Sequence, residues 1–171
     1  MYKVFQIKIG KEVRDFVNSN DRGHLGGEEK FPIYEAQMRL NRGRTQEFLD
    51  SDFQHFTHVA SVKKDAGLVD GNGDAWNIDG LEDVFRVLNG VYFDEDTEAD
   101  VVFDNHVSDY KMKTITRKDG EVVTYRDMHS LSVGDIVQDV DNGTFHIVAS
   151  YGYNDVTDQI KNWTETTLEV A

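Results

Sequence analysis

Hydrophobic and polar residues alternate at the start of the chain, which predicts a β-strand over residues 2–9. Three apolar residues at helical spacing come next and predict a short helix over 11–20: Val13, Phe16 and Val17. The stretch 21–30 holds Asp21, Gly23, Gly26 and Gly27 and is expected to be a loop.

Order is expected to return at Pro32. Proline suits the first turn of a helix, because it lacks a backbone N–H where that group has no helical partner. A helix is therefore predicted over 32–42, with a further helical turn over 45–52. Residues 56–62 are rich in β-branched and aromatic side chains, so a second strand is predicted there.

A helix is predicted after Asp79, because Asp79 and Glu82 have the spacing of a capping box. Four apolar residues follow at the positions of one helical face: Leu81, Val84, Phe85 and Leu88. Asn89-Gly90 is a typical helix end.

The last third of the chain has the pattern of β-hairpins. Asp119-Gly120 and Asn142-Gly143 each separate two alternating runs, and both dipeptides favour the tight turns that join antiparallel strands. The runs are 112–117 and 122–125 for the first hairpin, and 136–140 and 145–149 for the second. A final edge strand is expected over 163–170.

These patterns together predict an α+β fold, in which a mostly antiparallel sheet with C-terminal hairpins packs against two or three helices. The length of 171 residues suits one domain over 1–171. A division into a helical part, 1–52, and a β-rich part, 53–171, is the alternative. Ten Phe, seven Tyr and two Trp provide enough apolar area for a core.

Composition narrows the classes of protein. The absence of Cys excludes a disulfide framework, a thiolate zinc site and a Cys nucleophile. No run of residues has the length and apolar character of a membrane span, and the alternating N-terminus is unlike a signal peptide. We therefore expect a soluble protein of the cytoplasm (the host cytoplasm if the chain is viral) that makes no membrane contact.

The net charge of −14 is unevenly distributed, with a balance of +2 over residues 1–64 and −16 over 65–171. Such an acidic chain repels nucleic-acid backbones, so direct nucleic-acid binding is not expected. Arg39, Arg42 and Arg44 are the exception, and they are either a nucleic-acid contact or the solvated end of a helix. The acidic half is either ordinary solvated surface or an imitation of a nucleic acid that binds a basic protein.

The segment Asp70-Gly71-Asn72-Gly73-Asp74 suggests calcium, because oxygen side chains at positions 1, 3 and 5 begin a calcium-binding loop. The candidate ligands are Asp70, Asn72, Asp74 and Glu82. The pattern then departs from such loops, since position 6 is Ala75 rather than Gly and position 12 is Leu81. A simple turn followed by a capped helix is the alternative explanation.

Histidine and serine residues do not form a recognisable catalytic motif. His55 and His58 fall on opposite faces of a strand. His129, Ser130, Ser132 and Asp135 are close in sequence, but they lack the Gly-x-Ser-x-Gly turn of many hydrolases, and a loop leading into the strand at Ile136 explains them. In Gly134-Asp135 the glycine is expected to supply a positive φ or a close approach. No catalytic residue is assigned, and the sequence favours a protein that is not an enzyme.

Three blocks carry a resemblance to a known group. They are residues 56–62, residues 81–89, and Ser130-Leu131-Ser132-Val133-Gly134-Asp135-Ile136-Val137 together with residues 145–153. In this order they resemble a group of small uncharacterised proteins from phages, archaea and mobile elements, whose C-terminal strand pair is similar to the YodL-like domain. The resemblance implies a fold and a phage or mobile-element origin, but no catalytic residue.

The leading hypothesis from the sequence is an accessory protein that acts by protein–protein contact through its acidic half. Its candidate binding residues are an acidic connector and two tyrosines expected on one strand face: Asp94, Glu95, Asp96, Glu98, Tyr151 and Tyr153. The alternative is a small-molecule or calcium-binding domain that uses the loop from Asp70 to Glu82. Oligomeric state and partner identity are not specified by the sequence.

Overall fold

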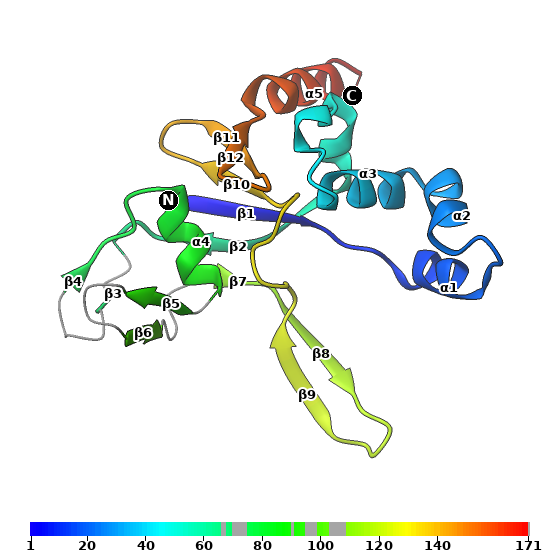
Figure 1. Cartoon of the computed structure of the whole chain (residues 1–171), viewed down its shortest axis with the longest axis horizontal. Coiled ribbons are helices and arrows are strands. Elements are labelled where there is room, and N and C mark those ends of the chain that lie inside the picture. Colours follow the sequence, from blue (N-terminus) through cyan, green and yellow to red (C-terminus); the bar gives the residue numbers. More distant parts are fainter. Residues whose placement is uncertain (66–67, 70–74, 90, 95–98, 103–108, 171) are drawn as a thin grey trace.

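The computed structural model describes residues 1–65, 68–69, 75–89, 91–94, 99–102 and 109–170, and their side chains over 1–65, 77–89 and 111–166. Six of the described strands form one antiparallel sheet (Figure 1) in the order β12-β11-β10-β1-β2-β7. They are β1 (Tyr2–Ile7), β2 (Phe56–Val62), β7 (Asp109–Tyr110), β10 (Ile136–Asp139), β11 (Thr144–Val148) and β12 (Tyr153–Asp155). The α+β fold class predicted from the sequence is confirmed.

The N-terminal strand β1 lies in the middle of this sheet, between β10 and β2. Its alternation places Val4 in one hydrophobic core and Ile7 in the other, so both faces of the sheet are covered. The register with β2 shifts between Val4 and Phe5, where the pairing contains an irregularity. Because β1 pairs with β2 on one side and β10 on the other, it joins the N-terminal and C-terminal parts of the chain in one sheet.

Helices cover the two faces of the sheet unequally. On one face α4 (Leu81–Asn89) packs Val84, Val87 and Leu88 against β1, β2 and β10. The other face holds α3 (Pro32–Asn41), the short 3₁₀ helices η1 (Thr45–Glu47) and η2 (Asp50–His55), and α5 (Thr157–Val170). Five phenylalanines pack together on this second face, with neighbouring ring centroids 5.6–6.4 Å apart: Phe5, Phe48, Phe53, Phe56 and Phe145.

The capping arrangement of α4 is shifted by one residue from the prediction. Gly80 is the N-cap, because its carbonyl accepts the hydrogen bond from the N–H of Val84. The carboxylate that reaches back belongs to Asp83, which accepts from the N–H of Asp79 at 2.9 Å. The capping box between Asp79 and Glu82 is therefore wrong, although the helix itself is confirmed.

The expected loop over 21–30 is wrong. Helix α1 (Lys11–Ser19) is followed by a second helix, α2 (Gly23–Lys30). Gly27 explains this difference, because a Cβ atom there would lie 2.5 Å from Val17 and 2.9 Å from Tyr34. Glycine thus lets α2 pack closely against α1 and α3, and this packing outweighs its low intrinsic helix propensity.

The expected edge strand over 163–170 is also wrong, because these residues belong to helix α5. The helix begins where Asp155 accepts a hydrogen bond from the N–H of Thr157 at 2.8 Å. The hydroxyls of Thr164 and Thr166 donate to carbonyls four residues earlier, which accommodates these β-branched residues in a helix. Burial of Ile160 in the second core holds α5 on the sheet.

Three further pairs of the described strands lie outside the main sheet, and one of these pairs has described side chains. It is formed by β8 (Met112–Thr116) and β9 (Val122–Arg126), and we call it the arm. The other two pair β3 (Leu68–Val69) with β4 (Ala75–Trp76), and β5 (Val91–Asp94) with β6 (Ala99–Val102). The sequence predicts the arm correctly as a hairpin, but the arm projects from the sheet rather than joining it (Figure 1).

No helix in the described part of the chain is both long enough and apolar enough to cross a membrane.

Candidate functional site

The segment that connects the arm to β10, residues 127–135, is anchored to the sheet by a buried polar side chain. Gln6 is fully buried on β1. Its amide nitrogen donates to the carbonyl of His129 at 3.0 Å and to the carboxylate of Asp135 at 3.0 Å, and its amide oxygen accepts from the N–H of His129 at 3.2 Å. We call this segment the His129 loop, and Gln6 joins both of its ends to the central strand.

Asp135 is the buried acid of this loop. Its carboxylate also accepts a hydrogen bond from the N–H of Ser132 at 2.8 Å, and it lies 3.7 Å from the ring Nδ1 of His129. Burial raises the pKa of Asp135 to about 6, and the nearby His129 and these hydrogen bonds offset part of this effect. The loop therefore contains a carboxylate that titrates near neutral pH.

This arrangement does not resemble a hydrolytic triad. Nδ1 of His129 lies 2.7 Å from the carbonyl of Ser130, to which it can donate, and the hydroxyl of Ser132 donates to the same carbonyl at 2.9 Å. A serine nucleophile needs a hydrogen bond to its base, and none joins His129 to a serine hydroxyl among the described residues. The hydrogen bonds hold the loop in place, and we assign no catalytic residue.

Gly134 combines both properties expected of it. Its φ is 93°, and a Cβ atom there would lie 2.7 Å from the side chain of Asn41. The His129 loop therefore passes close to the end of α3. Beside it lies an open recess of about 620 Å³, lined by Gln37, Asn41, His129, Ser130, Ser132 and Val133.

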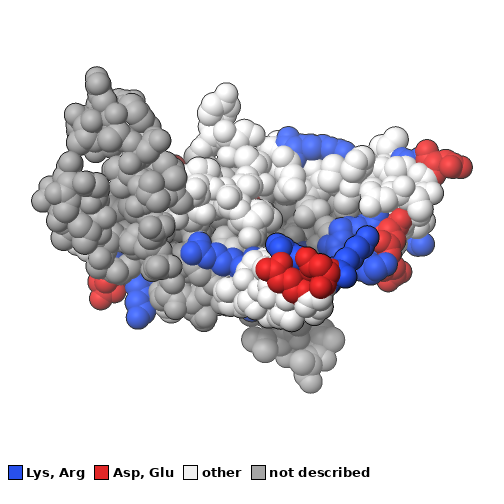
Figure 2. Space-filling model, turned by 90° about the horizontal axis from the view of Figure 1, so that it is seen from below, with Lys and Arg blue, Asp and Glu red and all other residues white. Residues whose placement is uncertain are grey.

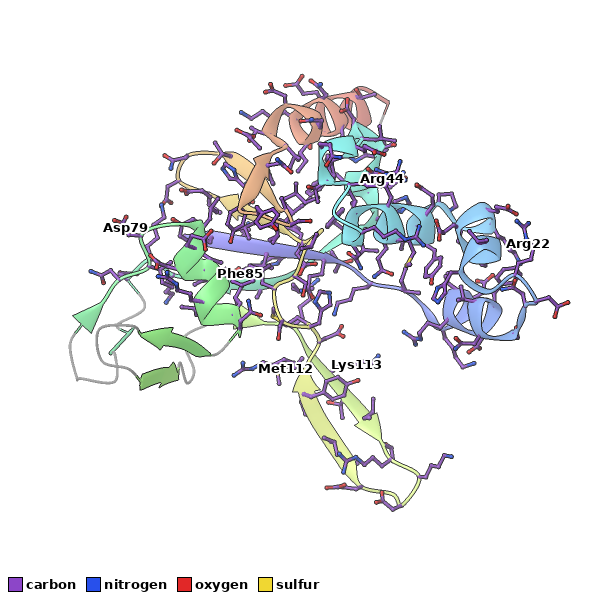
Figure 3. All side chains as sticks on the ribbon, in the orientation of Figure 1. Arg22, Arg44, Asp79, Phe85, Met112 and Lys113 are labelled. Atoms are coloured by element: carbon purple, nitrogen blue, oxygen red, sulfur yellow. The ribbon has the colours of Figure 1, made fainter. Side chains whose placement is uncertain are left out.

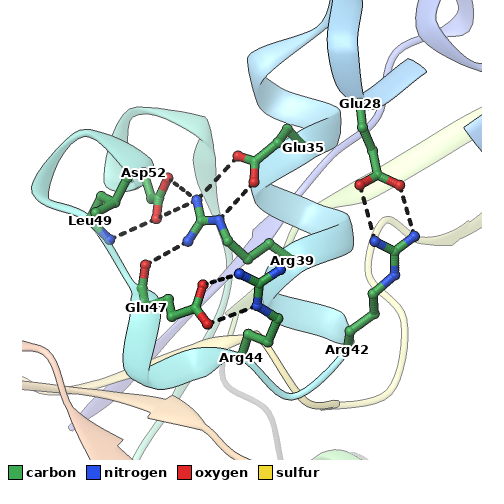
Figure 4. Close-up of polar contacts among 8 residues, drawn as sticks. All are labelled: Glu28, Glu35, Arg39, Arg42, Arg44, Glu47, Leu49 and Asp52. Carbon is green, nitrogen blue, oxygen red and sulfur yellow. Dashed lines mark hydrogen bonds and ion pairs between the residues drawn. The ribbon is translucent and has the colours of Figure 1, made fainter. Parts of the chain in front are cut away.

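Arg39 is the centre of a buried ion-pair network between α3 and η2 (Figure 4). Its guanidinium donates to Asp52 at 2.9 and 3.1 Å, to Glu35 at 2.8 Å and to the carbonyl of Glu47 at 2.6 Å. Burial lowers the pKa of Arg39, but the bonds from Glu35 and Asp52 outweigh it and raise the pKa above its ordinary value. Asp52 also accepts from the N–H of Leu49 at 2.8 Å.

The two neighbouring arginines are paired as well (Figure 4). Arg42 binds both carboxylate oxygens of Glu28 at 2.8 and 3.0 Å, and Arg44 binds the carboxylate of Glu47 in the same two-pronged way. Bidentate pairs of this kind are specific in geometry. Neither interpretation of this cluster describes it in full, because Arg39 is buried rather than solvated and all three guanidinium groups bind carboxylates. Arg39 connects α3 to η2 and Arg42 connects the end of α3 to α2, whereas Arg44 pairs within its own turn.

Tyr151 and Tyr153 do not form the aromatic surface expected from the sequence. Tyr151 is 96% exposed, whereas Tyr153 packs against the first core and its hydroxyl donates to the carbonyl of Leu81 at 2.8 Å. Gly152, with φ at 64°, turns the chain between them just before β12 begins. The two side chains therefore have different environments, and burial raises the pKa of Tyr153.

The other sequence candidates lie mostly outside the described side chains. This holds for Asp94 and for Asp70, Asn72, Asp74, Glu95, Asp96 and Glu98. Glu82 is exposed on α4, and no cluster of three or more His, Asp or Glu residues in the described part of the chain could hold a metal ion. The calcium site therefore stays a prediction, which calorimetric titration with Ca²⁺ can test.

Among the strands whose side chains are described, the arm has the most exposed apolar surface (Figure 3 labels Met112 and Lys113 at its base). Four of its apolar side chains are between 39% and 65% exposed: Met112, Ile115, Val122 and Tyr125. The pairing register places Ile115 opposite Val123 and Lys113 opposite Tyr125. One face of the arm is therefore formed by Lys113, Ile115, Val123 and Tyr125. That face contains three apolar side chains and one lysine, and no described helix lies over it (Figure 1).

The charge of the arm differs from that of the chain. Residues 111–118 contain four basic residues and no acidic one, whereas 119–127 contain three acidic residues and one basic. The net charge of −16 over residues 65–171 hides this basic segment, because the sum also includes many acidic residues. The four bases are visible in the sequence, but none of them is among the binding residues predicted from it.

The acidic excess lies largely outside the described side chains. Among the residues whose side chains are described, 22 acidic and 18 basic residues nearly balance, so ten of the 32 acidic residues and none of the basic ones lie elsewhere in the chain. On the face shown in Figure 2, described acidic and basic side chains lie next to one another rather than in a stripe of one sign.

The fold and the site thus define an α+β protein with a six-stranded antiparallel sheet in its described part, an anchored loop and a projecting basic hairpin. No family model matches the chain, and no curated protein and no solved structure matches it. The resemblance to the phage and mobile-element group therefore stays a prediction.

Proposed function

We propose that the chain is a non-enzymatic protein-binding module that contacts its partner through the arm. The observation that carries this proposal is the exposure of Met112, Ile115, Val122 and Tyr125 on a hairpin that projects from the sheet. Ile115 and Tyr125 share one face with Val123, whereas Met112 and Val122 lie on the opposite face. Exposed apolar side chains that lie together, as on the first face, are typical of protein-binding sites. In the proposal, an accessory role in a phage or mobile element comes from the sequence resemblance alone.

The physical argument is that the arm gains little from its own fold. A two-stranded hairpin in water is marginally stable by itself, and no described helix or other strand packs extensively on β8 or β9. A partner that covers the apolar face would remove Ile115, Val123 and Tyr125 from water and thereby contribute binding free energy. The same argument does not apply to the Arg39 network, whose charges already have partners.

The acidic half of the chain has a secondary part in this proposal. A net charge of −14 accelerates the approach of a partner with a basic surface, in a way that depends on ionic strength. The described surface is nearly balanced in charge, so support for an acidic contact surface comes only from the sequence of the remaining segments.

The test replaces the arm by a short turn. The N–H of Asp127 donates to the carbonyl of Lys111 at 2.7 Å, so these residues form the hydrogen-bonded pair that closes the arm at its base. A two-residue Asn-Gly turn can join such a pair directly, which allows residues 112–126 to be replaced without opening the sheet.

Photo-crosslinking from position 125 in cells that naturally produce the chain would identify the partner, which is then purified for affinity measurements. The replacement should lower that affinity at least about tenfold, the effect of losing a main contact, while the melting temperature stays unchanged. A crosslinking residue at exposed Leu49 is the matched control. Equal affinity of the replaced and complete chains would refute the proposal.

A further inference from the structure

We propose that the outer edge of β8 accepts an extended, acidic and apolar segment of the partner as an additional β-strand. This inference rests on the proposed function and specifies its contact. It concerns the backbone edge from Met112 to Thr116, and the occupant is a peptide segment in which every second residue is in turn acidic and apolar, so that both kinds lie on the same face of the added strand. Strand addition of this kind uses backbone hydrogen bonds for affinity and side chains for selection.

The hydrogen bonds at the two ends of the arm define which backbone groups point outward. At the base Asp127 N–H donates to Lys111 O at 2.7 Å, and at the tip Arg117 N–H donates to Glu121 O at 2.8 Å. In an antiparallel pair, hydrogen-bonded and non-hydrogen-bonded positions alternate. Positions 113 and 115 therefore bond to β9, whereas Met112, Thr114 and Thr116 direct their N–H and C=O groups to the outer edge.

This edge is open to a further strand. All five residues of β8 are exposed, and the one proline of the chain is Pro32, so every outward position of β8 carries a donor. A strand added here would also extend the face that holds Lys113, Ile115, Val123 and Tyr125. Its apolar residues would cover Ile115, and an acidic residue would lie near Lys113.

Charge distinguishes the β8 edge from the β9 edge. Residues 111–118 carry four bases and no acid, whereas 119–127 carry three acids and one base. Arg117 is paired with Glu121 across the turn. Among the described residues, no carboxylate lies within ion-pair distance of Lys113 or Lys118, so these two lysines are available to an acidic segment.

The same charges disfavour other occupants. The β8 edge of a second copy would bring four bases against four bases, which is the way natural edge strands prevent self-association. A nucleic acid would approach a chain of net charge −14, which opposes a long polyphosphate much more than a short acidic peptide. An acidic, extended peptide satisfies both the lysines and the open backbone groups.

The experiment measures binding of a fluorescein-labelled peptide of twelve residues to the full chain by fluorescence anisotropy. The peptide has the repeat Glu-Thr-Val-Thr, which places Glu and Val in turn along one face of an added strand. Thr114→Pro removes an outward N–H from the β8 edge. Thr124→Pro is the matched control, because Thr124 lies directly opposite Thr114, shares its hydroxyl hydrogen bond at 2.8 Å and points its N–H to the β9 edge. Both substitutions leave the β8–β9 ladder bonds in place.

We expect Thr114→Pro to weaken binding about tenfold or more, since backbone pairing along β8 is interrupted, while Thr124→Pro keeps the affinity within about twofold. A second pair tests charge: Lys113→Glu should weaken binding at least about fivefold, whereas the exposed Lys161→Glu, an equal change of net charge, should not. Circular dichroism of each variant confirms that the sheet is intact.

Several results would overturn the inference. The first is that the peptide that contains Glu and Val does not bind. The second is that Thr114→Pro and Thr124→Pro lower its affinity equally. The others are that a peptide with Lys in place of Glu binds equally well, or that a single-stranded oligonucleotide binds more tightly. Sedimentation that shows arm-dependent dimers would instead assign the edge to a second copy. If the inference fails while arm replacement still abolishes binding of the natural partner, the proposed function stands and only the occupant of the edge is wrong.

Discussion

Two groups of basic residues in this chain have opposite surroundings. On α3 and the turn after it, Arg39, Arg42 and Arg44 each bind a carboxylate, and Arg39 is buried. On the arm, Lys113 and Lys118 have no carboxylate within ion-pair distance among the described residues. The first group joins elements of the fold, and the second group is exposed on a hairpin that contributes nothing to either core.

The difference shows that a basic cluster in a sequence does not by itself indicate a binding surface. The three arginines are the candidate for nucleic-acid contact, yet each already binds a carboxylate: Arg42 binds Glu28 of α2, Arg39 binds Asp52 of η2, and Arg44 binds Glu47 three residues further on. The arm lysines are not among the candidates predicted from the sequence, because the acidic residues of the same half of the chain outnumber them. Whether a basic side chain is paired within the fold depends on its neighbours in space and not on the charges near it in sequence.

The largest expected effect is on the Arg39 network. Asp52→Ala leaves the buried guanidinium without its main buried partner and removes the acceptor for the N–H of Leu49, so we expect the free energy of unfolding to fall by about 3–5 kcal/mol. Urea denaturation followed by circular dichroism measures it. Glu47→Ala, which removes an exposed carboxylate of the same cluster, should have a much smaller effect. Equal effects of the two would mean that burial does not distinguish these pairs.

The next effect concerns the contact of the His129 loop with α3. Gly134→Ala forces a side chain onto a backbone with φ of 93° and places its Cβ 2.7 Å from Asn41, so we expect a loss of about 2–4 kcal/mol. Gly143→Ala is the matched control, because its φ of 66° is also positive but no atom lies within 4 Å of the new Cβ. Its loss should be about 1 kcal/mol. Similar losses would show that α3 does not constrain the loop.

Local patterns in the sequence predict most of the fold. The alternation of residues 2–9, the helical spacing after Lys11 and the Asp-Gly and Asn-Gly turns each specify an element from neighbours in sequence. The structure confirms the strand as β1, which ends at Ile7, and also confirms α1 and the hairpins. Gly120 and Gly143 have the positive φ that such turns need. These features depend on backbone preference and periodicity, which a single sequence contains.

The failures have a tertiary cause. Helix α2 contains three glycines, and its formation depends on packing of Gly27 against Val17 and Tyr34, which the local sequence does not reveal. The threonines of α5 suggest a strand until Ile160 is known to be buried. For the site, the link from Gln6 to Asp135 spans 129 positions, so sequence proximity could indicate the His129 loop but not its anchor.

A third prediction concerns pH. Because burial raises the pKa of Asp135 to about 6 in the folded state, above about 3.9 in an unfolded chain, the folded state binds the proton more tightly. The contribution of this group to stability is therefore fully present below about pH 4 and is lost as the pH rises through about 6. Relative to Asp135→Asn, the wild-type chain should lose about 2–3 kcal/mol between pH 4 and 7.

Urea denaturation of both proteins across this range measures the difference. The charged and titratable groups near Asp135 are His129 and Lys8, and Lys8 itself contacts Asp127. His129→Gln therefore serves as a control for coupling to the imidazole. A difference that is constant with pH would show that Asp135 does not bind a proton in the folded state, and that only its hydrogen bonds hold the loop.

The smallest expected effect compares the two basic groups directly. Removing two positive charges from the paired group, by Arg42→Ala with Arg44→Ala, should lower the melting temperature measurably, because two bidentate pairs are lost, one between α2 and the end of α3 and one within a single turn. Removing two from the arm, by Lys113→Ala with Lys118→Ala, should leave it unchanged or raise it slightly, since no described carboxylate pairs with them. Both double variants change the net charge from −14 to −16, so long-range repulsion is matched and only local pairing differs.

Differential scanning calorimetry in low and high salt measures the melting temperatures. Salt should reduce the decrease in melting temperature of the arginine variant, because it screens ion pairs, and should leave the lysine variant unaffected. A larger loss from the lysine variant would reverse the comparison and assign the arm lysines to the fold.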